Sequence, residues 1–114
     1  MEDLGGKIVV ITGASRGIGR SIAVNIAKCG AAVVINYNRD EKGAYKTLEM
    51  VREAGSTGIV VQGDVSLYED AEKIVRDAIG KMGKIDVLVN NAGICHIGLF
   101  VDMQQKQWDS IIDV

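Results

Sequence analysis

The sequence lacks proline altogether and has little of several features that identify special classes of protein. Its two cysteines, Cys29 and Cys95, lie far apart, so neither a disulfide framework nor a metal cluster is expected, and both thiols should be reduced, as in the cytoplasm. Its longest apolar runs, such as 31–35, are far too short to span a bilayer. The start Met1-Glu2-Asp3 is acidic, whereas a secretory signal begins with basic residues. With 13 basic and 15 acidic residues, the net charge of −2 gives no electrostatic footprint for nucleic acid.

Glycine and apolar residues are what the sequence has in quantity, with 14 glycines and 47% hydrophobic residues in 114. Disordered chains are polar, so these glycines are expected in turns and at close approaches of the backbone. Short β-branched runs predict strands at 7–12, 32–37, 58–62 and 86–90, and amphipathic stretches predict helices ending near 29, over 41–53, over about 71–82, and over 104–114. Strands that alternate with helices predict a doubly wound α/β domain with a parallel sheet.

Two of these helices carry detailed predictions about their faces and ends. In the third, Ser66 with Glu69 has the form of a capping box, and Gly83 ends the apolar pattern. In the first, Gly30 stands where a helix-terminating glycine belongs. The apolar face of the first helix is predicted from isoleucines at four-residue spacing, Ile18, Ile22 and Ile26.

The sharpest local signal is the run Thr12–Gly19 between the first strand and the first helix. Gly13 permits a tight turn, Gly17 removes a side chain where a pyrophosphate would approach backbone N–H groups, and Gly19 allows close packing of the helix on the sheet. The spacing G-x-x-x-G-x-G differs from the common dinucleotide fingerprint, and a simple tight turn is the alternative. Its place between strand and helix favours nucleotide binding.

This run resembles the cofactor loop of the short-chain dehydrogenase/reductase family. Two further marks of that family occur in order, Asn90-Asn91-Ala92-Gly93 after the fourth strand and Gly63-Asp64-Val65 after the third. The resemblance covers essentially the whole chain. It implies a Rossmann-like sheet with four strands in the order 3-2-1-4, the remaining strands of the full fold being missing, so that residues 1–114 are an incomplete NAD(P)-binding domain.

The resemblance also implies which residues contact a nicotinamide dinucleotide. Asp64 would hold the adenine, although an acidic residue closing a strand also serves simple turns. Arg39 and Arg16 resemble the phosphate-binding cations of NADP-preferring members, so NADP is favoured over NAD; the alternatives are a solvated Arg39 and an Asp40 that turns in to meet a ribose. The implied cofactor-binding residues are Gly13, Ala14, Ser15, Arg16, Gly17, Ile18, Gly19, Asn38, Arg39, Asp64, Val65, Asn91, Ala92 and Gly93.

The reacting half of the family's site is absent from the sequence. Members use an Asn–Ser–Tyr–Lys constellation with Tyr-x-x-x-Lys spacing, but the residues four positions after Tyr37, Tyr45 and Tyr68 are all glutamates. No catalytic residue is therefore expected in this chain, and the single histidine, His96, is expected to have no chemical role. We expect a fragment of an NADP-dependent oxidoreductase, inactive alone, that resembles 3-oxoacyl-(acyl-carrier-protein) reductases, acts when whole on a small carbonyl or acyl substrate, and belongs to a homo-oligomer. The alternatives are a non-catalytic NAD(P)-binding module and a self-associating interaction element.

Overall fold

The computed structural model describes residues 3–92 and 112–113, and all strands in it run parallel. The elements in chain order are β1 (Ile8–Ile11), α1 (Gly17–Lys28), β2 (Ala32–Tyr37), α2 (Glu41–Glu53), β3 (Gly58–Gln62), α3 (Tyr68–Met82), β4 (Val87–Val89) and β5 (Ile112–Asp113). The sheet order is β3-β2-β1-β4-β5. The predicted Rossmann-like α/β fold and the order 3-2-1-4 of the first four strands are confirmed.

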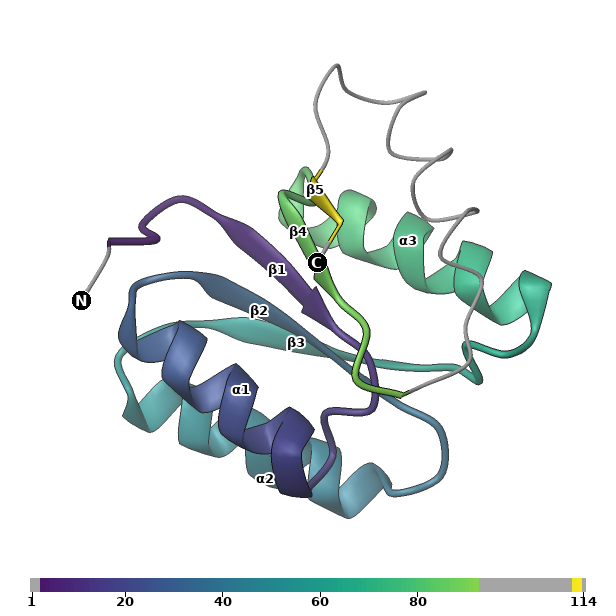
Figure 1. The fold of residues 1–114 in the computed structure, drawn as a ribbon, viewed down its shortest axis with the longest axis horizontal. Coiled ribbons are helices and arrows are strands. Elements are labelled where there is room, and N and C mark those ends of the chain that lie inside the picture. The colour runs from purple at the N-terminus through teal and green to yellow at the C-terminus, as the bar shows by residue number, and fades with distance from the viewer. Residues whose placement is uncertain (1–2, 93–111, 114) are drawn as a thin grey trace.

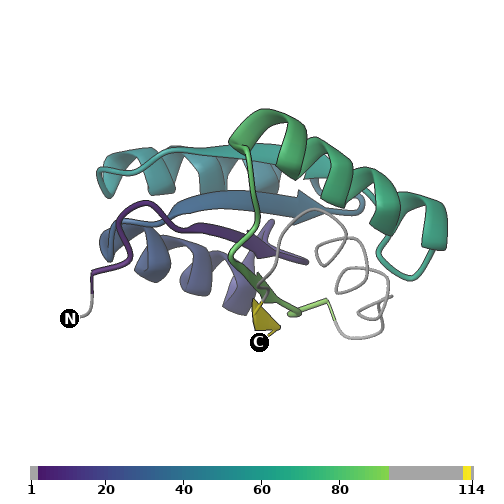
Figure 2. The same cartoon turned by 90° about the horizontal axis from the view of Figure 1, so that it is seen from above.

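Helices cover both faces of this sheet, with α1 and α2 on one face and α3 on the other (Figures 1 and 2). Alternate residues of each strand enter opposite cores, so that Val9 and Ile11 pack toward α1 and α2 while Val10 packs toward α3. Burial on both faces explains why these strands are continuous apolar runs in the sequence. In the described ranges, no helix is long and apolar enough to cross a membrane.

The buried face of α1 differs from the predicted one. The helix buries Gly19, Ala23 and Ala27, whereas Ile18 is 73% exposed. Ile22 and Ile26 only border the core. Small residues let α1 lie close to the sheet, and the larger isoleucines then fit only beside the contact line. The predicted isoleucine face is therefore wrong at Ile18.

The predicted capping box at the start of α3 is also wrong. The cap residue is Leu67, which makes no side-chain capping bond. The hydroxyl of Ser66 instead donates to Oδ1 of Asp64 at 2.6 Å, and the Ser66 N–H donates to the same oxygen at 3.0 Å. The carboxylate two residues earlier therefore engages the side chain that the motif assigned to the helix. The helix ends as predicted, at Gly83, whose φ of 90° is a left-handed conformation.

The last predicted helix, over 104–114, is wrong at Ile112–Asp113, where the backbone forms β5 parallel to β4. Without a neighbouring strand, the outer side of β4 would expose unpaired N–H and C=O groups. The extended segment beside it forms hydrogen bonds with them. The remainder of that predicted helix lies outside the described residues.

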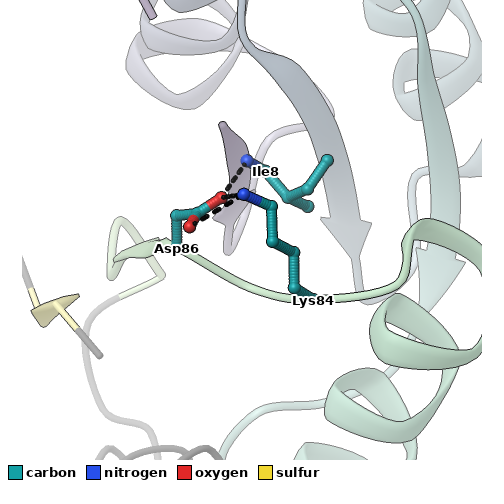
Figure 3. A network of polar contacts seen from close by, with 3 residues as sticks. All are labelled: Ile8, Lys84 and Asp86. Carbon is teal, nitrogen blue, oxygen red and sulfur yellow. Dashed lines mark hydrogen bonds and ion pairs between the residues drawn. The ribbon is translucent and has the colours of Figure 1, made fainter. Parts of the chain in front are cut away.

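Hydrogen bonds between Asp86 and Ile8 connect the starts of β1 and β4 at the amino end of the sheet, and Lys84 pairs with the same carboxylate (Figure 3). Oδ2 of Asp86 accepts the Ile8 N–H at 2.7 Å and lies 3.0 Å from Nζ of Lys84. The Asp86 N–H donates in turn to the Ile8 carbonyl at 2.9 Å. This reciprocal pairing aligns β1 with β4. The carboxyl ends of both strands therefore lie side by side at the other end of the sheet.

Candidate functional site

A cleft of about 400 Å³ lies where the first four strands end. Such a crevice, outside the carboxyl ends of parallel strands, is the usual ligand site of an open α/β sheet. Its lining residues are Gly13, Asn36, Asn38, Gly63, Asp64, Val65, Ser66 and Ala92. The structure therefore brings together five of the residues predicted to bind the cofactor, from the ends of all four strands. Asn36, Gly63 and Ser66 line the cleft as well, although none was predicted as a binding residue.

Asn36 supports the floor of this cleft. It is 2% exposed, and its Oδ1 accepts the Gly13 N–H at 3.2 Å. Its Nδ2 donates to the carbonyls of Gly63 at 3.1 Å and Val61 at 3.3 Å. One amide thus ties together the turns that follow β1 and β3. The signal in the sequence is a single polar side chain inside the apolar run of β2, since a buried amide needs partners on neighbouring strands.

Thr12 holds the segment after β4 against the turn after β1. Its buried hydroxyl accepts the N–H groups of Asn91 at 3.0 Å and Ala92 at 3.1 Å. The hydroxyl lies 3.1 Å from Oδ1 of Asn90 and donates to it. Asn91 adds a bond from its Nδ2 to the Gly13 carbonyl at 2.9 Å. The predicted residues Asn91 and Ala92 are therefore placed by this hydroxyl beside the glycine loop.

The three glycines of the loop meet different physical demands. Gly13 and Gly17 have φ values of 64° and 60°, which L side chains rarely adopt. A Cβ on Gly19 would lie 2.7 Å from Nδ2 of Asn91 and closer still to the Gly13 carbonyl. Gly19 thus permits contact with the turn and with Asn91, in addition to the predicted close packing of the helix on the sheet.

The loop presents free backbone donors at the start of α1. In the described part of the chain, the N–H groups of Ser15 and Arg16 bond to no acceptor. The cap residue Arg16 makes no side-chain capping bond, and the first turn of α1 carries no acidic residue. Unsatisfied N–H groups and the positive end of the helix dipole together favour an anion here.

Asp64 supplies a negative charge on the other side of the cleft. Its pKa is lowered chiefly by the hydrogen bonds from the Ser66 hydroxyl and N–H, and further by the Arg39 cation, against an opposing effect of burial. The carboxyl is therefore ionised at neutral pH and accepts hydrogen bonds.

The two acidic residues that follow Arg39 both accept hydrogen bonds, Asp40 from the first turn of α2 and Glu41 from the end of β2. Oδ1 of Asp40 accepts the Gly43 N–H at 2.9 Å and so caps this helix. Oε2 of Glu41 accepts the Tyr37 hydroxyl at 3.2 Å, and burial together with this contact raises the pKa of Tyr37. Asn38 and Arg39, which precede them in the chain, are exposed, and Asn38 lines the cleft. The alternative role of Asp40, turning in toward a ribose, would break a helix cap.

The remaining predicted residues lie outside the cleft lining. Ala14 is buried behind the loop, and Arg16 and Ile18 are exposed. Gly93 and His96 lie outside the described residues.

Comparison with known proteins gives a family match over most of the chain. The family model described as short chain dehydrogenase matches residues 7–114. An uncharacterized oxidoreductase of Methylorubrum extorquens is 42% identical over 114 residues, which are 100% of this chain and 46% of that protein. The chain thus spans less than half the length of this relative.

Solved structures resemble the described fold as well. A dehydrogenase/reductase from Sinorhizobium meliloti is 36% identical with a TM-score of 0.77, over 81% of this chain and 36% of that one. A protein from Burkholderia cenocepacia solved with bound NADP is 35% identical with a TM-score of 0.75, over 79% of this chain and 35% of that one.

Proposed function

Because the chain belongs to the short-chain dehydrogenase family, we propose that its cleft binds the adenosine end of NADP(H) and that residues 1–114 form the cofactor-binding part of an NADP-dependent oxidoreductase. When bound, the dinucleotide supplies hydride exchange between its nicotinamide and a carbonyl or alcohol carbon. The observation that carries this proposal is the cleft itself, which is lined by Gly13 at the start of the glycine loop and by the ionised carboxylate of Asp64.

The residues around the cleft fit such a ligand. The Asp64 carboxylate is an acceptor for the exocyclic amino group of adenine, with Val65 beside it. The loop 13–19 offers N–H donors to the diphosphate, and the absence of a side chain at Gly17, where nothing lies within 4 Å, leaves the backbone there open to approach. Asn91 and Ala92, with Gly93, would border the adenosine ribose. No step of the proposed binding needs a metal ion.

The preference for NADP over NAD rests on charge. A ribose 2′-phosphate is favoured by a nearby arginine and repelled by a free carboxylate. Arg39 acts on the cleft, and Asn38 lines it. Asp40 and Glu41, the carboxylates that would repel the phosphate, accept hydrogen bonds from the Gly43 N–H of α2 and the Tyr37 hydroxyl of β2, respectively. Arg16 is exposed at the cap of α1 and adds a second cation for the same phosphate.

Calorimetry with NADP⁺ and NAD⁺ tests both parts of this proposal. We expect the chain to bind both and NADP⁺ about tenfold more tightly, the worth of one charge-assisted contact. Arg39→Ala should remove most of that difference, while Arg52→Ala, an exposed arginine in the last turn of α2, should leave it unchanged. Equal affinities in the unmodified chain would contradict the preference for NADP, and absence of binding would contradict the function.

The catalytic step is proposed to require residues other than these 114. No Tyr-x-x-x-Lys spacing occurs in the sequence, so a homogeneous chain should show no turnover with NADPH and a carbonyl substrate. Measurable turnover would refute this. We propose a small carbonyl or acyl substrate for the whole protein and a resemblance to the 3-oxoacyl-(acyl-carrier-protein) reductases. We further propose a cytoplasmic location. We also propose that the whole protein is a homo-oligomer, which sedimentation of that protein would test.

A further inference from the structure

The first turn of α2 is bound to the back of the glycine loop. Arg20, on α1, donates from Nη2 to the Ser15 carbonyl at 2.7 Å and to the Gly43 carbonyl at 3.1 Å. Its Nε donates to Oγ1 of Thr47 at 3.0 Å. The buried Thr47 hydroxyl donates in turn to the Ala14 carbonyl at 2.8 Å. We call Arg20 and Thr47 together the loop clamp.

Gly43 brings the helix close enough for this clamp to form. A Cβ at Gly43 would lie 2.5 Å from the Ser15 carbonyl oxygen, which leaves no room for a side chain. Helix stability does not explain a glycine at this position, because glycine lowers the stability of a helix. It indicates that α2 and the loop are fitted to each other.

The clamp decides which way two peptide groups of the loop face. In a trans peptide the C=O and the following N–H point in opposite directions. The Ala14 carbonyl is held by Thr47, so the Ser15 N–H points away from α2. The Ser15 carbonyl is held by Arg20, so the Arg16 N–H does the same. Neither of these two N–H groups has an acceptor among the described residues.

We propose that Arg20 and Thr47 are positioning residues for phosphate binding, which turn the N–H groups of Ser15 and Arg16 toward the bound phosphates without contacting the ligand themselves. This inference rests on the proposed function. The same clamp also fixes α2, whose preceding residues 38–40 form the proposed 2′-phosphate side of the site. It therefore connects the two phosphate-binding regions of the chain through one arginine.

Loss of the clamp and loss of the Arg39 cation should affect the affinities for different ligands. Loss of the clamp disturbs donors that serve any phosphate-bearing ligand, so NADP⁺ and NAD⁺ should both bind more weakly. Loss of Arg39 should affect NADP⁺ alone. Adenosine, which has no phosphate, should bind a clamp variant as it binds the unmodified chain, because the residues that line the cleft do not include Arg20 or Thr47.

The test uses the full chain and three probes: inorganic pyrophosphate, the two dinucleotides and adenosine. In ¹H–¹⁵N spectra of the unmodified chain, pyrophosphate should shift the N–H signals of Ser15 and Arg16. Arg20→Gln should weaken pyrophosphate, NADP⁺ and NAD⁺ binding roughly tenfold, as expected for loss of charge-assisted hydrogen bonds. Arg20→Lys, which keeps the charge and one donor direction, should restore part of the affinity. Arg52→Gln is the matched control and should change nothing.

Thr47→Val provides an independent perturbation if Arg20→Gln does not fold, and Thr47→Ser is its rescue. Thr47→Val should weaken pyrophosphate binding severalfold, and Thr47→Ser should restore it. Folded clamp variants that bind pyrophosphate within twofold of the unmodified chain would overturn the inference, even if their melting temperatures fall, while leaving the proposed function standing. An unmodified chain that binds neither pyrophosphate nor a dinucleotide would overturn both.

Discussion

Removal of the Thr12 hydroxyl isolates the contact that joins the turn after β1 to the segment after β4. Thr12→Val keeps the shape of the side chain and replaces only the hydroxyl by a methyl group. In the fold, this oxygen accepts two backbone N–H groups, those of Asn91 and Ala92, and donates to Asn90. The substitution leaves both N–H groups without that acceptor.

The expected cost follows from the number of bonds and their exposure. Each lost hydrogen bond is worth about 1 kcal/mol net, and a buried unsatisfied group costs up to about 3 kcal/mol. Asn91 is half-buried and Ala92 is exposed, so water reaches both donors and the cost stays near the lower figure. We expect a loss of about 2 kcal/mol in the free energy of unfolding, a sizeable part of the 5–15 kcal/mol typical of a domain. The melting temperature should fall by about 10 °C.

Urea unfolding followed by circular dichroism measures this loss, and two variants control it. Thr12→Ser keeps the hydroxyl and loses one buried methyl, at a cost of about 1 kcal/mol. Thr57→Val makes the same chemical change at an exposed position and should stay within about 0.5 kcal/mol of the unmodified chain. If packing dominated at Thr12, serine would be worse than valine. A serine variant less stable than the valine variant would therefore refute the reasoning.

Further predictions concern the two ends of the sheet and the helices. Asp86→Ala should lower the free energy of unfolding by about 1–3 kcal/mol in urea titrations, because a strand N–H loses its acceptor, while dinucleotide affinity, set at the opposite edge, stays unchanged in calorimetry. Gly19→Ala should lower the free energy of unfolding by about 1–3 kcal/mol, because its Cβ would overlap the loop. Gly80→Ala, with nothing near its Cβ inside α3, should raise the free energy of unfolding by about 0.5–1 kcal/mol in the same assay. Because the pKa of Asp64 is lowered in the fold, its contribution to stability is present above the unfolded value near 3.9 and is lost as the pH falls through the lower folded value. Ser66→Ala should raise the pKa of Asp64 toward its ordinary value in an NMR titration of the carboxyl carbon, and an unchanged pKa would contradict the assigned cause.

The strands were predictable because a strand that is buried on both faces is a continuous apolar run in the sequence. The run Val33–Tyr37 is apolar at almost every position, since one set of side chains enters each core. Helix ends at Gly30 and Gly83 were predictable for a similarly local reason, because each glycine adopts a positive φ that other residues rarely adopt. The resemblance to the family then supplied the strand order and five of the eight residues that line the cleft.

The sequence did not predict the features in which a side chain has more than one possible hydrogen-bond or packing partner. Ser66 fits a capping pattern, but a carboxylate two residues earlier offers it a shorter path to a hydrogen bond. Ile18 fits a helical stripe, but only the small residues Ala23 and Ala27 let α1 lie close to the sheet. The roles of Asn36 and Arg20 depend on residues more than 20 positions away in the chain, which no local pattern contains.

The position of the cleft follows from the way in which the chain leaves the sheet. After β1 and β2 the chain turns to the face covered by α1 and α2, and after β3 it turns to the face covered by α3 (Figure 2). The connections therefore separate at the carboxyl edge, and the space between them would close if large side chains stood there. The residues at this point include Gly13, Gly63 and Ala92, which are too small to fill it. Polar atoms of Asn36 and Thr12 satisfy the backbone that these small residues leave uncovered. The open space and the hydrogen bonds that keep it open are thus one feature, so a substitution that stabilises the turn by filling the cleft should reduce ligand binding.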